Sequence, residues 1–303
     1  MKIAVIGAGY WGKNHVRDLK KLGHNVVVCD LDQKNLDYCM EKFEADAVTK
    51  NLSDILKDKS IVAATVCVPN HLHFSTAKKL LSAGKHVLVE KPMCLKSSDC
   101  KKLAALAKKK KLVLNVGHLF RFNPSIIKLK ELLDQKELGE IRLAKFSWTN
   151  LDPIYPDRDI ISDLGVHAFD IFNFLFGKNP KLLSSTGEVF RKPKDVETAL
   201  ITARLGKTIA LFDLSWVTPE KKRVVTIVGS KKMAVCDTMT QSIALTDVSS
   251  LQVQSIVSEN VNPLLLELQH FVECIESKAK SRAPGKLGLE IVQFIEQAQK
   301  QLK

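Results

Sequence analysis

The stretch KIAVIGAGYWG, residues 2–12, places a short apolar run before three glycines spaced G-x-G-x-x-G, and a helix-like segment follows it. This context predicts a strand, a tight turn and a helix that bind a dinucleotide. Gly7 permits the turn, Gly9 leaves room for a pyrophosphate against the backbone, and Gly12 allows the helix to pack close to the strand. A purely structural glycine turn is the alternative. The residues expected to contact the cofactor here are Gly7, Gly9, Tyr10, Trp11 and Gly12.

Asp30 ends the next predicted strand, roughly twenty residues after the glycines, where a carboxylate meets the hydroxyls of the adenosine ribose. Such a carboxylate repels a 2′-phosphate, so the sequence favours NAD and leaves NADP open because Lys34 is nearby. Asp32 is interpreted as a helix N-cap rather than a ligand.

The first 118 residues alternate short strands with helices, which predicts a doubly wound parallel sheet of the Rossmann type. The expected strands are 2–6, 25–30, 61–68, 86–90 and 112–116. The expected helices are 11–21, 34–43, 72–83 and 97–110. Ligands of such sheets collect at the carboxyl ends of the strands. Marked residues stand at three of these ends: the glycines, the segment 68–71, and the segment 90–92.

From residue 119 onward the pattern changes to consecutive strands joined by short turns, which predicts an α+β domain with a large, mainly antiparallel sheet. The expected strands are 141–149, 182–189, 197–205, 208–216, 223–228 and 233–237. The expected helices are 124–133, 163–176, 263–277 and 287–302. The segment 247–262 is expected to be a loop or an irregular strand. We therefore divide the chain into residues 1–118, which bind the dinucleotide, and residues 119–303, which bind substrate and form oligomer contacts. The C-terminal helix could pack back on the first domain.

The composition indicates a globular protein, with 45% hydrophobic and 26% charged residues among 303. No apolar run approaches the ~20 residues that span a bilayer, and the N-terminus enters a strand at once, so a cytoplasmic location is expected. Seven scattered cysteines without a C-x-x-C pair argue against a disulfide framework or a zinc site. No metal is expected.

The net charge of +13 is unusual and admits nucleic acid, an anionic membrane or acidic small molecules as partners. Much of the excess comes from lysine runs such as 108–111, which complement a helix dipole at its C-terminal end. No nucleic-acid-reading motif accompanies them. A phosphorylated small molecule fits the charge better than a nucleic acid or a membrane does.

Glu90-Lys91-Pro92 follows a predicted strand of the first domain and faces the expected ligand edge. A lysine there can stabilise a developing alkoxide, whereas the alternative is a surface lysine in a turn. The proline indicates a fixed backbone, with a cis bond as one option.

Asp163 and His167 stand four residues apart in a predicted helix, so they share one face. A histidine beside a carboxylate is placed to accept a hydroxyl proton as a general base. The alternative is that Asp163 caps the helix and His167 is a half-buried structural residue. Asp170, one turn further on, is interpreted as structural.

These motifs in this order resemble the Gfo/Idh/MocA family of NAD(P)-dependent sugar and cyclitol dehydrogenases over essentially the whole chain. The resemblance rests on the glycine motif, on VPNHLH (68–73), on GKHVLVEKP (84–92) and on DLGVH (163–167). It implies that Lys91, Asp163 and His167 are catalytic, with His167 as the acid/base. It also implies that Pro69, Asn70 and His71 lie beneath the cofactor, that Glu90 contacts its ribose, and that the Lys91–Pro92 bond is cis. The chain has Ala168 where many relatives have Asp.

The stretch GHLFRFNP (117–124) and the pair Arg158-Asp159 are similar to motifs in the branches that act on UDP-N-acetylhexosamines and their uronates. The resemblance implies substrate contacts from Arg121, Asn123, Arg158 and His167. Arginine forks onto phosphates and carboxylates, although a salt bridge to Asp or Glu at the domain interface explains Arg121 and Arg158 nearly as well.

We therefore expect an NAD-dependent oxidoreductase that moves a hydride from a secondary hydroxyl of a sugar, with a UDP-linked sugar favoured. The alternatives are an inositol, free-sugar or sugar-acid dehydrogenase, a member that makes no net redox change, and a redox-silent protein that senses NAD or a sugar. The expected partners are the small-molecule substrate and further copies of the chain in a homodimer or homotetramer.

Overall fold

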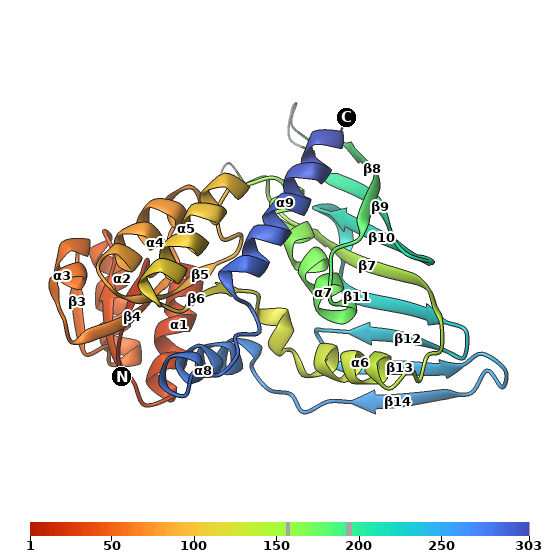
Figure 1. Ribbon diagram of the computed structural model, residues 1–303, viewed down its shortest axis with the longest axis horizontal. Helices are drawn as coiled ribbons and strands as arrows, with labels where there is room; N and C mark the ends of the chain where they lie inside the picture. Colours follow the sequence, from red (N-terminus) through yellow and green to blue (C-terminus); the bar gives the residue numbers. More distant parts are fainter. Residues whose placement is uncertain (156–157, 192–195, 303) are drawn as a thin grey trace. The chain divides into compact units, whose positions relative to one another are not determined.

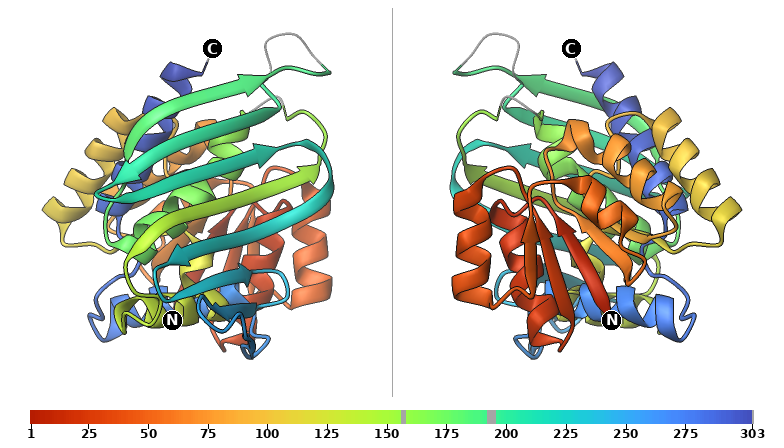
Figure 2. Two further views of the ribbon diagram at one scale, coloured as in Figure 1. Left: turned by 90° about the vertical axis from the view of Figure 1, so that its right-hand side faces the viewer. Right: turned by 90° about the vertical axis from the view of Figure 1, so that its left-hand side faces the viewer.

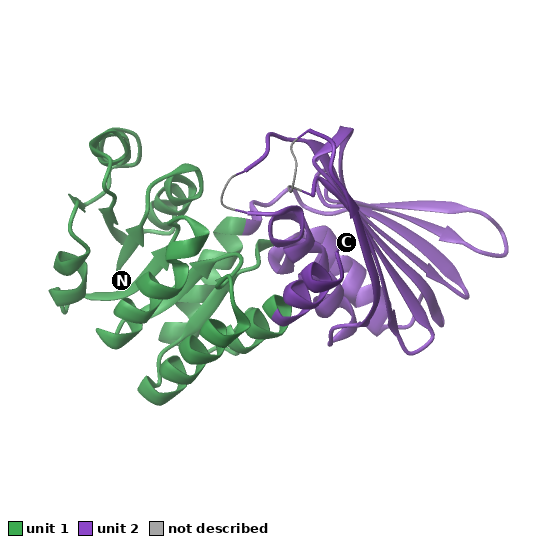
Figure 3. Cartoon of the chain, turned by 90° about the horizontal axis from the view of Figure 1, so that it is seen from above, with its two compact units in different colours: residues 1–119, 264–292 green, residues 120–263, 293–303 purple. Residues whose placement is uncertain are grey.

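Residues 1–155, 158–191 and 196–302 are described by a computed structural model, which divides into two compact units. Met1–Leu119 and Leu264–Val292 form the first unit, and Phe120–Pro263 with Gln293–Lys303 form the second (Figure 3). The boundary near residue 119 lies beside the one expected from the sequence. The later segment of the first unit had been expected in the second domain.

Six parallel strands form the sheet of the first unit, in the order β3-β2-β1-β4-β5-β6 (Figure 1). The strands are β1 (Lys2–Ile6), β2 (Asn25–Cys29), β3 (Ala47–Thr49), β4 (Ile61–Val66), β5 (His86–Glu90) and β6 (Leu114–Gly117). The helices between them are α1 (Tyr10–Lys21), α2 (Gln33–Phe43), α3 (Leu52–Lys57), α4 (His73–Ser82) and α5 (Ser97–Lys110), with a short 3₁₀ turn at Asn70–Leu72. The predicted Rossmann-type sheet is confirmed.

Strand β1 lies in the middle of this sheet because its side chains are buried on both faces. Ala4 and Ile6 belong to one apolar core, whereas Ile3 and Val5 belong to the other. Successive strand side chains point to opposite faces, so an uninterrupted apolar run needs cover on both sides.

The helix α8 (Pro263–Glu276) joins the first unit through its apolar face. Leu264, Leu268 and Phe271 pack into the core that also holds Ile3 and Val5. The next helix, α9 (Gly285–Gln301), begins in the same unit, where Val292 enters the other core. We had expected such a placement for the C-terminal helix alone.

Eight strands form the sheet of the second unit, in the order β14-β13-β12-β11-β7-β10-β9-β8. The strands are β7 (Ile141–Leu151), β8 (Lys181–Glu188), β9 (Thr198–Leu205), β10 (Thr208–Ser215), β11 (Val217–Gly229), β12 (Lys232–Asp237), β13 (Ser242–Asp247) and β14 (Val253–Val257). All neighbours are antiparallel except β7 and β10, so the expected mainly antiparallel sheet is confirmed.

One face of this sheet carries α6 (Pro124–Asp134), a π-helical turn at Ile161–Gly165, α7 (Val166–Phe176) and the end of α9. Phe146 and Phe212 of the strands stack there at 5.1 Å, and Phe169 of α7 meets Phe212 edge-on at 4.9 Å. In the left view of Figure 2 the strands lie in front of these helices. The described part of the chain places no helix on the other face.

Three strands and one α-helix were not predicted: β3, β13, β14 and α3. Strand β3 has three residues, too few for a period to be recognised. Strand β14 lies in the segment that we expected to be a loop or irregular, and it is an exposed edge strand whose valines contact solvent. Edge strands need little apolar alternation, so their sequences resemble loops. No helix among the described residues is long and apolar enough to cross a membrane.

A buried ion pair ties α1 to the end of β5. His15 is 0% exposed, and its Nε2 lies 2.9 Å from Oε1 of Glu90. Burial by itself lowers the pKa of His15, but Cys67 and Glu90 together raise it well above its ordinary 6.5. Burial likewise opposes ionisation of Glu90, yet His15 and Lys91 bring the pKa of Glu90 below its ordinary 4.5. The two directions agree on a charged pair.

The pair predicts a pH-dependent stability. His15 has a raised pKa, so its contribution is complete below the unfolded value of 6.5 and is lost as the pH rises through the folded value. Glu90 has a lowered pKa, so its contribution is present above 4.5 and is lost as the pH falls. We predict that His15→Gln lowers the free energy of unfolding by about 3–5 kcal/mol near pH 6, because a buried carboxylate loses its partner. The loss should shrink at higher pH.

Urea unfolding of wild type and His15→Gln, followed by circular dichroism at pH 6 and again well above pH 7, measures this difference. Lys128→Gln is the matched control, because it breaks an exposed ion pair with Glu131 and should change little. Equal losses for His15→Gln at the two pH values would contradict a charged pair.

Candidate functional site

The glycine-rich turn after β1 has the close contacts that the motif requires. Gly7 has φ +88°, and a Cβ there would lie 2.8 Å from the carbonyl carbon and oxygen of Cys67. A Cβ on Gly12 would lie 1.9 Å from the carbonyl oxygen of Gly7. By contrast, a Cβ on Gly9 would meet no described atom within 4 Å. The turn is therefore tight at its ends and open at Gly9, the N-cap of α1, and a helix N-terminus of this kind attracts anions.

Asp30 follows β2 at the same edge of the sheet. Its Oδ2 accepts a hydrogen bond from the Ala8 amide at 2.5 Å, and its Oδ1 accepts one from the Asp32 amide at 2.8 Å. Asp32 caps α2 through the Lys34 amide, as expected. The carboxylate of Asp30 thus lies beside the glycine turn.

The loops after β4 and β5 are joined by His73, a residue whose role sequence reasoning missed. Its Nδ1 lies 2.8 Å from the Pro92 carbonyl oxygen and its Nε2 lies 2.9 Å from the Val68 carbonyl oxygen. Burial lowers the pKa of His73, while the two carbonyls favour a ring that donates from both nitrogens. Pro69, Asn70 and His71 lie in the first of these loops, where Asn70 begins the 3₁₀ turn.

Glu90 and Lys91 lie at the carboxyl end of β5. Oε1 of Glu90 is held by His15, and its Oε2 accepts the Lys91 amide at 3.1 Å. Gly117 on β6 leaves room for this carboxylate, since a Cβ there would lie 3.1 Å from Oε2. The Lys91–Pro92 bond is cis, as expected. His15 was also missed from the sequence, although its position three residues after Gly12 was a usable signal.

In the second unit, Asp163 and His167 lie on consecutive turns, but not in the regular helix that we expected. Asp163 is in the π-helical turn and His167 is in the first turn of α7. Every residue from 160 to 173 is buried except His167, which is half-buried. The ring of His167 meets the ring of Phe120 edge-on, with the two centroids 5.1 Å apart. π-Helical turns occur frequently at functional sites.

The carboxylate of Asp163 lies among aromatic and cationic groups. Its Oδ2 accepts from Trp216 Nε1 at 3.3 Å, and its Oδ1 lies 3.5 Å from Arg158. The Arg158 guanidinium stands 4.8 Å from the ring centre of Tyr155, which meets Trp216 edge-on at 5.7 Å. Asp163 is therefore not the helix cap that was the alternative. Asp159 makes the capping contacts, to the amides of residues 161 and 162.

Arg121 and Asn123 are buried among residues of their own unit. Arg121 binds Oδ1 of Asp170 at 2.7 Å and the side-chain oxygen of Asn173 at 3.0 Å. Asn123 caps α6 through the Ser125 amide. These contacts match the structural interpretation of Asp170 and give Arg121 an ion pair, but the pair lies within the second unit and not at the domain interface that the alternative named. Direct substrate contacts from Arg121 and Asn123 stay predictions.

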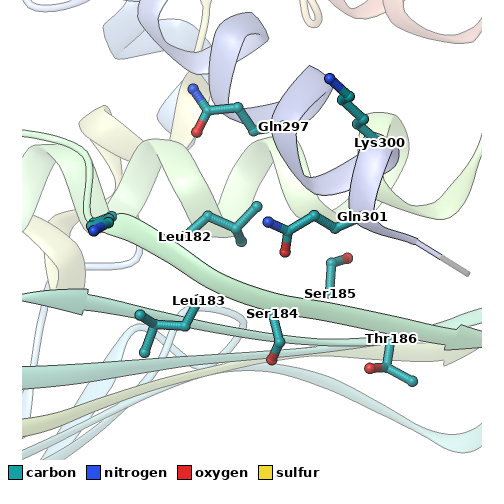
Figure 4. Close-up of a pocket in the computed structure, with 9 residues that line it drawn as sticks. Leu182, Leu183, Ser184, Ser185, Thr186, Gln297, Lys300 and Gln301 are labelled. Atoms are coloured by element: carbon teal, nitrogen blue, oxygen red, sulfur yellow. The ribbon is translucent and has the colours of Figure 1, made fainter.

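A separate hollow of about 800 Å³ lies between β8 and the end of α9 (Figure 4). Leu182 and Ser185 of the strand and Gln297 and Gln301 of the helix point into it. It contains none of the predicted site residues. The predicted residues instead form two sets, one at the carboxyl edge of the first sheet and one around Asp163 and His167.

Comparison with known proteins identifies the family of this chain. A model described as an oxidoreductase family with an NAD-binding Rossmann fold (GFO_IDH_MocA) matches residues 1–118. The model of the GFO/IDH/MocA C-terminal domain matches residues 126–235.

Three curated relatives are each 27% identical to the chain. The uncharacterized oxidoreductase YrbE of Bacillus subtilis aligns over 65% of this chain and 62% of its own length. The myo-inositol 2-dehydrogenase of Thermotoga maritima aligns over 67% and 65%. The chain therefore spans less than two thirds of the length of these two relatives. The UDP-N-acetylglucosamine 3-dehydrogenase of Acidithiobacillus ferrooxidans aligns over 80% and 76%.

The solved structure of that last enzyme, GnnA, superposes with a TM-score of 0.88 at 22% identity and covers 100% of this chain and 97% of its own. At this identity the likeness concerns the fold. With both family models matching in order, the chain belongs to the GFO/IDH/MocA oxidoreductase family and has its NAD-binding Rossmann fold.

Proposed function

We propose that this protein is an NAD-dependent dehydrogenase that oxidises a secondary hydroxyl of a sugar, with a UDP-linked sugar as the preferred substrate. One observation carries the proposal: His167 is the half-buried polar residue of an otherwise buried segment, and it follows a carboxylate that Arg158 and Trp216 hold. The family's NAD-binding fold supplies the other half of the reaction.

Groups at the carboxyl edge of the first unit's sheet support NAD as the cofactor. The open amides at Gly9 suit a pyrophosphate, and the Asp30 carboxylate suits a ribose with a free 2′-hydroxyl. In this proposal Tyr10 and Trp11 flank the turn, the loop at 69–71 lies beneath the cofactor, and Glu90 contacts its ribose. NAD, when bound, accepts the hydride.

Three side chains carry the chemistry in this proposal. His167 removes the proton of the substrate hydroxyl as the general base. The ammonium group of Lys91 stabilises the negative charge that develops on the oxygen. Asp163 orients the base or the substrate, and its contacts with Trp216 and Arg158 fix the carboxylate for that purpose.

The preference for a nucleotide sugar is supported by Arg158. Its side chain is 29% exposed, so it can still meet a ligand while it contacts Asp163 and Tyr155. A guanidinium forks onto phosphate or carboxylate oxygens, and an aromatic ring beside it suits a base or sugar face. The UDP-N-acetylglucosamine 3-dehydrogenase is also the relative that aligns over the largest share of this chain among the three described. Because the chain is also similar to a myo-inositol 2-dehydrogenase, a cyclitol is the competing candidate substrate.

We also propose a homodimer or homotetramer, formed through the face of the second sheet that carries no described helix. Leu211 of β10 lies in one row across this face with Lys145 of β7, Thr226 of β11 and Val235 of β12. Leu200 is 63% exposed and Val235 is 44% exposed. Apolar side chains on an uncovered sheet face favour association with a second copy.

The central prediction concerns turnover. With NAD, the purified chain should reduce the nicotinamide when given UDP-N-acetylglucosamine or its uronate, measured by NADH absorbance, and should be slower with myo-inositol. Lys91→Ala should lower kcat by about 10²-fold or more while NAD affinity is largely kept, since the lost ammonium stabilises the transition state.

Lys96→Ala, an exposed lysine in the same loop, is the matched control and should keep full activity. Faster turnover of myo-inositol than of the UDP-linked sugars would indicate that the substrate is a cyclitol. NAD binding without reduction by any substrate would favour the redox-silent alternative. Unchanged kcat in Lys91→Ala at saturating sugar would remove the proposed role of that residue.

A second prediction concerns the choice of dinucleotide. Asp30→Asn keeps an oxygen beside the Ala8 amide but removes the charge, so the preference for NAD over NADP should fall by about tenfold or more. Isothermal titration with both cofactors measures the ratio. Asp32→Asn should leave it unchanged because Asp32 caps α2. An unaltered ratio in Asp30→Asn means that other residues select the cofactor.

A third prediction concerns assembly. Val235→Lys adds a charge to the uncovered sheet face on β12 and should convert the oligomer to a monomer. Light scattering coupled to size exclusion gives the mass. Leu251→Lys, in the exposed turn before β14, is the control and should leave the mass unchanged. A monomeric wild type at micromolar concentration would refute the proposed interface.

A further inference from the structure

The positive charge of the chain is concentrated in one segment of the first unit. Residues 78–111 contain eleven lysines and only two acidic residues. The lysines at 108–111 lie at the C-terminal end of α5, where they complement the helix dipole. That effect is confined to the last turn of a helix, and Lys101 lies seven residues before Lys108. The dipole therefore does not explain the whole set of lysines.

Lys101 and Lys108 stand at the two ends of one stripe of α5. Ala104 and Ala105 lie between them, and the spacing places all four residues on the same face of the helix. Beside this stripe of small side chains is a hollow of about 560 Å³. It is bordered by α5, by residues 112–115 at the start of β6, and by residues 279–289, which include the start of α9. All of these residues belong to the first unit.

The interior of this α5 hollow is apolar. Leu112, Leu114 and Leu289 line it and pack in the core beneath the helix. Gly285 allows α9 to start close to β6, because a Cβ there would lie 2.6 Å from the side chain of Leu114. The alkyl stems of lysines extend such an apolar surface while their ammonium groups stay in water. A hollow of this size and composition is typical of a small-molecule site.

The rim of the α5 hollow carries positive charge. Three lysines border it: Lys101, Lys108 and Lys286. Among the described residues, Lys101 and Lys108 form no ion pair, and Lys286 approaches Glu290 at 3.9 Å. The described residues that line the hollow include no Asp or Glu. An anionic group at the rim would therefore meet ammonium groups without displacing a close carboxylate.

Asn115 adds a hydrogen-bond donor to the apolar lining. It is 3% exposed, and its Oδ1 accepts from Oγ of Ser281 at 2.8 Å. Its Nδ2 makes one long contact with the described residues, 3.9 Å to the sulfur of Cys274. An amide nitrogen carries two N–H groups, so at least one can be donated to an oxygen atom of a ligand.

We propose that the α5 hollow is a binding site for an amphiphilic carboxylate, with the apolar chain inside the hollow and the anionic head among the lysines of its rim. Removal of the chain from water supplies affinity, and the lysines select the anion. The hollow borders the start of β6, whereas the predicted cofactor residues lie at the carboxyl edge of the same sheet. It is therefore distinct from the predicted cofactor site.

Titration of the full-length protein with decanoate, followed by isothermal calorimetry, tests the site. Wild type should bind a single decanoate per chain, with an affinity that falls as the salt concentration rises, because ions screen the lysines. Lys101→Gln combined with Lys108→Gln should weaken binding by about fivefold or more, since each exposed charge contributes modestly.

Lys102→Gln combined with Lys109→Gln is the matched control. It removes the same charge from the same helix, but neither residue lines the hollow, so the affinity should change by less than about twofold. Equal losses in the two double variants would mean that decanoate responds only to the overall charge, and would overturn the site.

A third variant tests the hollow rather than its charge. Ala104→Phe fills the space from α5 and leaves every lysine in place, so it should weaken decanoate binding by about tenfold or more. Circular dichroism checks that the variant is folded. Unchanged affinity in folded Ala104→Phe would place the ligand elsewhere on the lysine-rich surface and overturn the proposal.

A measurement on wild type alone decides the matter if Ala104→Phe does not fold. Decanoate with a diazirine at its chain end, irradiated in the complex, should label peptides from residues 101–115 and 279–289. Labelling confined to other segments would overturn the site. Neither the titration nor the labelling needs NAD or turnover, so this site and the proposed dehydrogenase activity can fail separately.

Discussion

The contact between Gly12 and the carbonyl oxygen of Gly7 is the constraint on which the first unit depends. A methyl group at Gly12 would come within 1.9 Å of that oxygen, so α1 can start here only if the side chain is absent. The contact sets how closely α1 approaches β1, and therefore where the amides at Gly9 and the side chain of His15 lie. The ion pair with Glu90 needs the same close approach, because His15 lies three residues after Gly12 on α1 and contacts Glu90 at the end of β5.

The two units present opposite kinds of electrostatic environment. In the first, the charges near the turn belong to a buried ion pair between His15 and Glu90. In the second, Asp163 meets a half-exposed arginine and the indole of Trp216, so the carboxylate is held by side chains. A fixed cradle suits a cofactor that is shared by many relatives, whereas side-chain contacts can differ from one substrate to another.

Local sequence patterns were sufficient for most of the first unit, since buried parallel strands and glycine turns leave strong periods and fixed spacings. They were insufficient where contacts between residues far apart in the sequence determine the structure. Arg121 could not be assigned to Asp170, 49 residues away, from spacing alone. The π-helical turn at Asp163 packs tightly at Gly165, where a Cβ would lie 3.0 Å from the side chain of Leu214 on β10. Nor did any local pattern link His73 to the carbonyl of Pro92.

Glu90 illustrates why a protein keeps a buried charge although its desolvation costs free energy. Desolvation makes a buried ion pair about as stable as an apolar pair of the same volume, so stability does not explain it. Its two oxygens serve different neighbours: one holds His15, and the other accepts the amide of Lys91. An apolar residue would fill the space but would release both the imidazole and the start of the Lys91 loop. The carboxylate is thus required because a single group joins His15 of α1 to the backbone of Lys91 at the end of β5.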